Sequence, residues 1–241
     1  MQESLVISNY QTMVQHLEAQ GFSFPSLYPR QPDSLVVTRL VSYLALLQAW
    51  TTRVDLVSPA TDLQQVQRHL VDCMAAQLVL GSVFSISSED AVGSKQLNLG
   101  QGRTADIGSG AGLPGLIWAI AEPQRQFVLV EPRKKRVVFL REVASRLQLE
   151  NLEIREERQE DLVKDLEKQL AVVACRALGA LSEYLNNSAK LLASGGVAIV
   201  LAGPGEIEAS VDSPELELLS PINYTCLPDG PARRLLVWKC N

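Results

Sequence analysis

The chain has 241 residues, of which 46% are hydrophobic, and its net charge is −5 at pH 7. That length suffices for one large α/β domain with a small extension, and the apolar content supports a buried core. The acidic balance excludes a generally basic nucleic-acid binder, so contact with a polyanion has to come from a local basic patch.

The cysteine and histidine content argues against a metal site or a disulfide framework. The chain has only two histidines, and its four cysteines lie far apart with no C-x-x-C pair. We therefore expect no metal and free thiols in a reducing compartment. The N-terminus lacks the pattern of a signal peptide, and no apolar run approaches the ~20 residues of a membrane helix. These features predict a cytoplasmic protein without membrane contact. We also expect a monomer, although these features do not determine the oligomeric state.

Two helical patterns occupy the first third of the chain. Over residues 33–50, Leu40, Leu44 and Leu47 recur at helical spacing, and Asp33 can cap the start. Residues 61–80 show the same spacing of apolar side chains. We expect residues 1–80 to form a helical extension packed on the core.

Residues 81–103 are rich in Gly and Ser and have no clear period. A structureless segment of this length is unusual inside a domain, so it is interpreted as a flexible surface insertion. The remaining residues, 104–241, then form the core domain.

Short β-branched runs alternate with helical patterns from residue 104 onward, which predicts a parallel sheet with right-handed crossovers. Residues 222–227 and 233–239 flank the turn sequence PDGPA and predict an antiparallel hairpin. The result is a mostly parallel seven-stranded sheet with helices, the Rossmann-like α/β layout of class I methyltransferases. The five expected parallel strands are Thr104–Ile107, Phe127–Glu131, Leu152–Arg155, Leu170–Cys175 and Val197–Leu201.

The sequence TADIGSGAGLPGLIWAI, residues 104–120, places a glycine turn between the first strand and the next helix. A dinucleotide site prefers G-x-G-x-x-G at this point, with a pyrophosphate at the helix N-terminus. Here Asp106 directly precedes the turn and Gly108, Gly110 and Gly112 alternate. This pattern favours S-adenosylmethionine, which has no phosphate and needs an acid near its ammonium group. A turn used only for packing is the alternative.

Polar residues follow the next three expected strands. Glu131 ends the second strand, where a carboxylate can bind both ribose hydroxyls of either cofactor, or can be merely structural. Gln159 and Glu160 lie in a charged loop that can contact an adenine or simply be solvated. Arg176 follows the fourth strand at the carboxyl edge of the sheet, where ligands bind; in isolation a salt bridge explains it as well.

A run of four cations, Arg133, Lys134, Lys135 and Arg136, falls at the start of a predicted helix. The helix dipole disfavours positive charge there. A contact with nucleic-acid phosphate explains this placement, and a solvated charged turn is the alternative.

Two motifs of other methyltransferases are missing. The sequence after the fourth strand, CRALGAL, is neither the Asn/Asp-Pro-Pro-aromatic motif of adenine amino-methylating enzymes nor the Pro-Cys setting of cytosine-C5 enzymes. The target is therefore expected to be a nucleophile that needs no covalent help.

From about Tyr43 to Lys239 the chain resembles the bacterial small-subunit rRNA guanine-N7 methyltransferases, also called glucose-inhibited division protein B. The motifs that carry the resemblance are RHLVD (68–72), DIGSGAGLPG (106–115), KRVVFLREV (135–143), ERQE (157–160), CRAL (175–178) and RRLLVWK (233–239).

The resemblance implies methyl transfer from S-adenosylmethionine to guanine N7 in 16S rRNA of the small ribosomal subunit. Guanine N7 has a free lone pair, so no general base is expected and Arg176 would only orient the reactants. The residues expected at the donor are Asp106, Gly108, Gly110, Gly112, Leu113, Glu131, Gln159, Glu160 and Arg176. The residues expected at the RNA are Arg68, His69, Arg133, Lys134, Lys135 and Arg136.

Departures from the family pattern leave two alternatives open. Ala202 replaces a lysine that usually follows the fifth strand, and Glu131-Pro132 stands where the second strand usually ends in Asp-Ser. The alternatives are a methyltransferase of the same fold with another substrate, and a non-catalytic nucleotide-binding regulatory protein.

Overall fold

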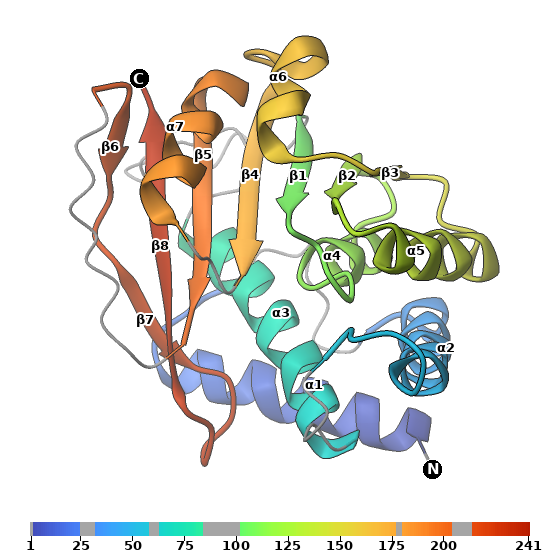
Figure 1. The fold of residues 1–241 in the computed structure, drawn as a ribbon. Coiled ribbons are helices and arrows are strands. Elements are labelled where there is room, and N and C mark those ends of the chain that lie inside the picture. The colour runs from blue at the N-terminus through green and yellow to red at the C-terminus, as the bar shows by residue number, and fades with distance from the viewer. Residues whose placement is uncertain (1, 25–31, 58–62, 84–101, 177–179, 204–213) are drawn as a thin grey trace.

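The computed structural model describes residues 2–24, 32–57, 63–83, 102–176, 180–203 and 214–241. Most of the expected insertion therefore lies outside the described residues. Figure 1 shows the arrangement of the helices and strands. The helices are α1 (Gln2–Ala19), α2 (Ser34–Thr51), α3 (Leu63–Val83), α4 (Gly115–Ala121), α5 (Lys134–Leu147), α6 (Gln159–Leu166) and α7 (Leu181–Leu191). The strands are β1 (Arg103–Ile107), β2 (Phe127–Val130), β3 (Leu152–Arg155), β4 (Leu170–Arg176), β5 (Leu192–Ala202), β6 (Leu216–Leu218), β7 (Ile222–Thr225) and β8 (Ala232–Cys240).

The sheet has the order β3-β2-β1-β4-β5-β8-β6, and β7 also pairs with β8. Strands β1 to β5 are parallel to one another, whereas β8 runs antiparallel to β5. Strands β6 and β7 pair with opposite ends of β8, so they form two segments along the same edge. The sheet therefore has eight strand segments in seven positions, where the sequence predicted seven strands.

Three further expectations are corrected by the structure. Helix α1 was not expected as an element, although Val6, Tyr10 and Leu17 form part of its buried stripe. The fifth strand, expected to begin at Val197, begins earlier, at Leu192, so residues 194–196 lie inside β5. Residues 159–160, expected in a loop, form the first turn of α6.

The alternation of side chains along the strands creates two apolar layers. In β5, Val197 and Ile199 face one layer, which also contains the buried residues of α1 to α5. Ala198 and Val200 face the other, which contains the buried residues of α6 and α7. The period of two in a strand thus gives the sheet a helical cover on both faces.

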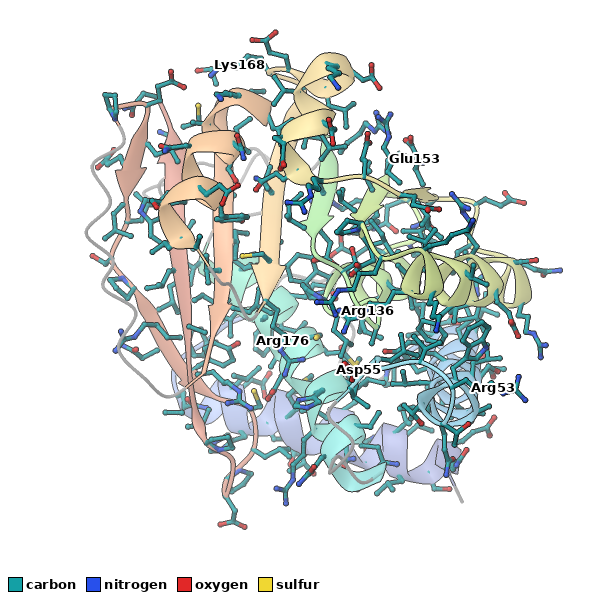
Figure 2. All side chains as sticks on the ribbon, in the orientation of Figure 1. Arg53, Asp55, Arg136, Glu153, Lys168 and Arg176 are labelled. Atoms are coloured by element: carbon teal, nitrogen blue, oxygen red, sulfur yellow. The ribbon has the colours of Figure 1, made fainter. Side chains whose placement is uncertain are left out.

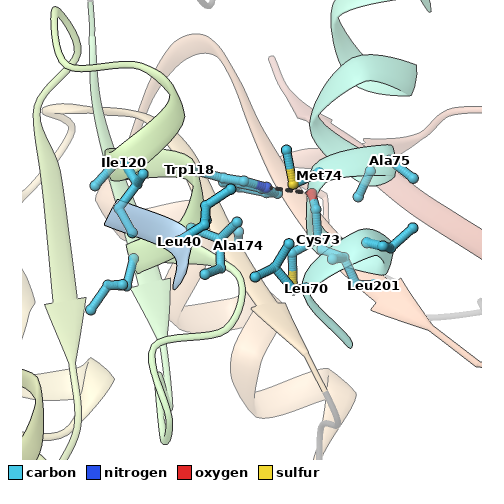
Figure 3. Packing of buried hydrophobic residues seen from close by; sticks show 14 of the residues in the cluster. Leu40, Leu70, Cys73, Met74, Ala75, Trp118, Ile120, Ala174 and Leu201 are labelled. Atoms are coloured by element: carbon cyan, nitrogen blue, oxygen red, sulfur yellow. Dashed lines mark hydrogen bonds between the residues drawn. The ribbon is translucent and has the colours of Figure 1, made fainter. Parts of the chain in front are cut away.

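The N-terminal helices share the first apolar layer with the sheet. Helix α2 is long and apolar enough to cross a membrane by length and composition, but its stripe of Leu40, Leu44 and Leu47 is buried in this layer. Figure 3 shows the packing around Trp118, whose Nε1–H donates to the carbonyl of Cys73 at 2.8 Å. This bond joins α4 to α3 inside the core.

Helix α1 is fixed to the sheet edge through β7. The side-chain amide of Gln20 donates to the carbonyl oxygen of Thr225 at 2.9 Å and accepts from the N–H of Thr225 at 2.9 Å. His16 Nε2 lies 2.7 Å from the hydroxyl of Thr225. The N-terminal helix and the C-terminal hairpin therefore support one another.

Replacement of Trp118 by phenylalanine tests the buried bond. Trp118→Phe removes this bond, while the Cys73 carbonyl keeps its helical partner, the N–H of Gln77, so the free energy of unfolding should fall by the net value of one hydrogen bond, about 0.5–1.5 kcal/mol. Urea unfolding measures the loss. Trp50→Phe is the matched control, because Trp50 is only partly buried and packs edge-on against Phe139 with centroids 5.8 Å apart. An equal loss in both variants would contradict the importance of the bond.

Candidate functional site

The glycine turn after β1 combines backbone freedom with tight packing. Gly108, Gly110 and Gly112 have φ angles of +70°, +56° and +88°, which other residues rarely adopt. A Cβ on Gly112 would lie 2.7 Å from Leu116, and one on Gly115 would lie 2.5 Å from Asp106, so these two positions are closed by packing. A Cβ on Gly108 would meet no atom within 4 Å. The open side of the turn is therefore at Gly108.

Asp106 supports the turn from below. Its Oδ2 accepts a hydrogen bond from the N–H of Gly115 at 3.0 Å, which fixes the start of α4. Its Oδ1 is buried and has no hydrogen-bond partner in the described part of the chain. Burial raises the pKa of Asp106 to about 7. The carboxyl group thus keeps one buried acceptor available to a cationic ligand.

Glu131 fastens the turn from the side. Its Oε2 accepts from the N–H of Gly110 at 3.0 Å, and its Oε1 accepts from the N–H of Arg133 at 2.9 Å. The residue is 2% exposed. Because each carboxylate oxygen has a second lone-pair site, Glu131 retains capacity to accept hydroxyl groups.

Two residues of other elements complete the support of the turn. The hydroxyl of Tyr43, on α2, donates to the carbonyl of Ala111 at 2.9 Å. Arg136 donates to the carbonyl of Asp55 through Nε and Nη2 at 3.0 and 2.7 Å, and its Nη1 lies 3.8 Å from Glu131. Figure 2 shows Arg136 between the sheet and the segment that carries Asp55. Sequence reasoning did not assign Tyr43 to the site.

A pocket of about 240 Å³ lies at the carboxyl ends of β1 and β4. It brings together four residues that the sequence predicted for the donor: Gly108, Gln159, Glu160 and Arg176. Leu113, also expected there, is partly buried and packs against the first apolar layer. The other lining residues are Ile107, Cys175, Ala180, Glu183, Tyr184 and Asn187.

Gln159 is held in the lining of the pocket by two side-chain hydrogen bonds. It is buried, and its amide donates to the carbonyl of Tyr184 at 3.1 Å and to the hydroxyl of Ser188 at 3.0 Å. These bonds fix the first turn of α6 against α7. Burial also raises the pKa of the Cys175 thiol well above its usual value, so this cysteine has no nucleophilic thiolate near neutral pH.

Arg176 joins the pocket to a cluster of charged residues from α3 and β8. Its Nη2 lies 2.7 Å from Nδ1 of His69 and 3.7 Å from Oδ2 of Asp72. Asp72 Oδ2 also accepts from Arg233 at 2.6 Å, and its Oδ1 accepts from the thiol of Cys226 at 3.2 Å. Burial would raise the pKa of Asp72, but its interactions with His69 and Arg233 hold that pKa below its usual value. Asp72 is therefore an anion between cations.

The cluster contains a residue that the sequence analysis missed. Asp72 lies three residues after His69, so both project from the same face of α3, a spacing that could have been recognised. The pairing with Arg233 could not, because that residue is 161 positions away.

The run of four basic residues divides into two groups. Arg133, Lys134 and Lys135 are exposed and form no ion pair with any residue in the described ranges, whereas Arg136 is partly buried and turned toward Glu131. Arg68, on α3, is likewise exposed. Within the described ranges, no three His, Cys, Asp or Glu side chains are placed to hold a metal ion.

The sheet order, with a glycine turn at the end of β1 and a pocket at the carboxyl ends of the strands, defines a class I methyltransferase fold. Residues 37–227 match the family model described as rRNA small subunit methyltransferase G, and the chain belongs to this family. Helix α1 lies outside the matched range.

Similar proteins bear the same description. A protein of Verminephrobacter eiseniae named ribosomal RNA small subunit methyltransferase G is 32% identical, over 86% of this chain and 87% of its own length. Proteins of the same name from Halorhodospira halophila and Xanthomonas oryzae are 30% and 31% identical, over 76% and 85% of this chain and 77% and 87% of their own lengths. A solved structure titled as a SAM-dependent methyltransferase from Aquifex aeolicus covers 60% of this chain and 86% of its own at 11% identity and a TM-score of 0.47.

The raised pKa of Asp106 predicts a specific dependence of stability on pH. The folded pKa of about 7 lies above the unfolded value of about 3.9. The stability from this group is therefore complete below about pH 4 and is lost as pH rises through 7. Asp106→Asn removes the titration. The wild-type free energy of unfolding, relative to the variant, should fall by about 1 kcal/mol per pH unit between pH 5 and 7. Urea unfolding at several pH values measures it, and a constant difference would refute the assignment.

Proposed function

We propose that the protein transfers a methyl group from S-adenosylmethionine to N7 of a guanine in 16S rRNA. The observation that carries the proposal is the position of Arg176, which lines the pocket beside the glycine turn and also contacts His69 on α3. Membership of the rRNA methyltransferase family supports the substrate class. The protein would act as a monomer in the cytoplasm, on the small subunit or its RNA.

The residues around the first pocket fit the methyl donor. The unpaired Oδ1 of Asp106 suits the ammonium group of the methionine part, and the open side of Gly108 allows close approach of a ligand. Glu131 has free lone pairs for the ribose hydroxyls. Gln159 and Glu160 line the region assigned to the adenosine. Gly110, next to Glu131, would border the ribose, whereas Gly112 acts through packing.

The chemistry requires alignment rather than proton transfer. S-adenosylmethionine, when bound, supplies an electrophilic methyl group on a sulfonium. The N7 lone pair of guanine forms the new N–C bond as the C–S bond breaks and its electron pair stays on sulfur. The protein therefore has to hold the base in line with the methyl group. Orientation of this kind can lower the reaction barrier by up to about 7–11 kcal/mol. Arg176 is the side chain assigned to this orientation.

The surroundings of Arg176 suit that role. His69 and Asp72 fix its guanidinium group, and the negative charge of Asp72 offsets positive charge next to a base that becomes cationic. The high pKa of the Cys175 thiol supports a mechanism without a covalent protein–RNA intermediate.

The decisive experiment maps N7-methylguanine in 16S rRNA with and without the gene. Purified protein should restore the modification in small subunits or in their RNA. Arg176→Ala should lower turnover by about 100-fold or more, whereas the control Arg146→Ala, at an exposed site at the end of α5, should not change it. Unchanged methylation after gene loss would refute the substrate. Donor binding without turnover on any RNA would favour the regulatory alternative.

The cofactor assignment predicts a pH-dependent affinity. The donor ammonium prefers the ionised form of Asp106, whose pKa burial raises to about 7. The association constant should therefore rise nearly tenfold per pH unit below pH 7 and level off above it. Calorimetry with S-adenosylmethionine measures this dependence, and NAD should not bind. In Asp106→Asn, binding should be weak and independent of pH. A wild-type affinity that does not change with pH would contradict the role of Asp106.

The exposed basic residues predict a salt-dependent contact with RNA. The double variant Arg133→Glu, Lys134→Glu should weaken RNA binding and reduce the slope of log affinity against log salt by about 0.7–0.9 per lost phosphate contact. Donor affinity should stay the same. Arg136 is excluded from the test because it supports Asp55 and Glu131. An unchanged slope would mean that the three cations form only a solvated helix start.

A further inference from the structure

A second, larger pocket of about 510 Å³ lies between α1, α3 and the turn that joins β7 to β8. A volume of this size suits a small organic ligand. Its lining residues are Asn9, Thr12, Gln65, Arg68, His69, Val71, Asp72, Cys226, Leu227, Pro228, Asp229, Gly230, Pro231 and Arg233.

The lining combines the surfaces that a nucleotide requires. Leu227, Pro228 and Pro231 provide apolar faces against which a base can stack. Asn9 and Thr12 provide amide and hydroxyl groups for the polar edge of a base.

Arg68 is placed to bind the phosphate. It is exposed at the margin of this pocket and forms no ion pair with a residue in the described part of the chain. Arg233, in contrast, donates to Asp72 at 2.6 Å, so its guanidinium group is already engaged by a carboxylate. The cation available to a phosphate is therefore Arg68.

The two pockets share a wall. His69 and Asp72 line the second pocket, and both lie against Arg176, which lines the first. The side chains of Arg176, His69 and Asp72 would thus lie between a base in the second pocket and the donor region. Figure 2 shows Arg176 just below the end of β4, where it overlaps α3 in this view.

We propose that this second pocket binds one nucleotide of the RNA substrate, with the extruded base against the Leu227–Pro231 turn and the phosphate on Arg68. The inference rests on the proposed function. It gives α1, which lies outside the family-matched range, a part in holding the RNA. A base turned out of its stack can enter such a pocket at a cost of a few kcal/mol.

The test uses guanosine 5′-monophosphate as the ligand, titrated by calorimetry against the full-length protein. Thr12→Trp places a large side chain in the pocket from an exposed position of α1. It should weaken binding at least tenfold, whereas Gln15→Trp, exposed on the same helix but not lining the pocket, should not. Arg68→Ala should weaken binding of the monophosphate and leave that of guanosine unchanged. The urea midpoint of each variant confirms that it is folded.

Several results would overturn the inference. Thr12→Trp and Arg68→Ala could bind the monophosphate as tightly as the wild type does. Inorganic phosphate could compete as well as the monophosphate, which would reduce the pocket to an anion site. Thr12→Trp could also methylate 16S rRNA with an unchanged KM, which would refute the pocket and leave the proposed function intact. Loss of monophosphate binding in Thr12→Trp, with no rRNA methylation by the wild type, would support the pocket and refute the proposed function.

Discussion

The carboxyl group of Asp106 ties the end of β1 to the first residue of α4, and the glycine turn between them takes its shape from this bond. Every neighbouring contact closes the same turn: Glu131 holds Gly110, and Tyr43 holds Ala111. Because burial opposes ionisation of Asp106, the fold retains an acid that is destabilising when charged. A cationic ligand beside Oδ1 would remove that disadvantage.

The charged cluster around Asp72 contains a second buried carboxyl group, and here the neighbouring residues favour the charged form. The Asp72 carboxylate accepts hydrogen bonds from Arg233 and Cys226, and it is stable as an anion in a buried position only while these donors remain in place. Arg176 reaches this cluster from β4, so α3, β4 and β8 are joined through a few side chains. The orientation of Arg176 therefore depends on elements that are distant in the sequence.

The parts of the fold that the sequence predicted are those with local causes. A glycine turn after a short apolar strand can be recognised directly in the sequence, and so can the alternation of β1 to β5 with helices. Helix α1 was missed although its buried stripe of Val6, Tyr10, Met13, Val14 and Leu17 has regular helical spacing. Strand β6 was missed because three residues carry little periodicity. Four residues expected at the donor, Gly108, Gln159, Glu160 and Arg176, do share a pocket, and their roles there stay predictions. Arg133 is exposed, whereas Arg136 is partly buried and donates to the carbonyl of Asp55. This is a tertiary contact, so the spacing of residues in the sequence does not reveal it.

The pairing of Gln20 with Thr225 has a consequence for self-association. A side-chain amide can present an N–H and a C=O side by side, as a peptide group does, and Gln20 uses one of each on the outer edge of β7. An exposed sheet edge is a template on which a foreign strand can add. At this position the template is already occupied by a residue of the same chain, so another molecule would have to displace α1 before it could extend the sheet.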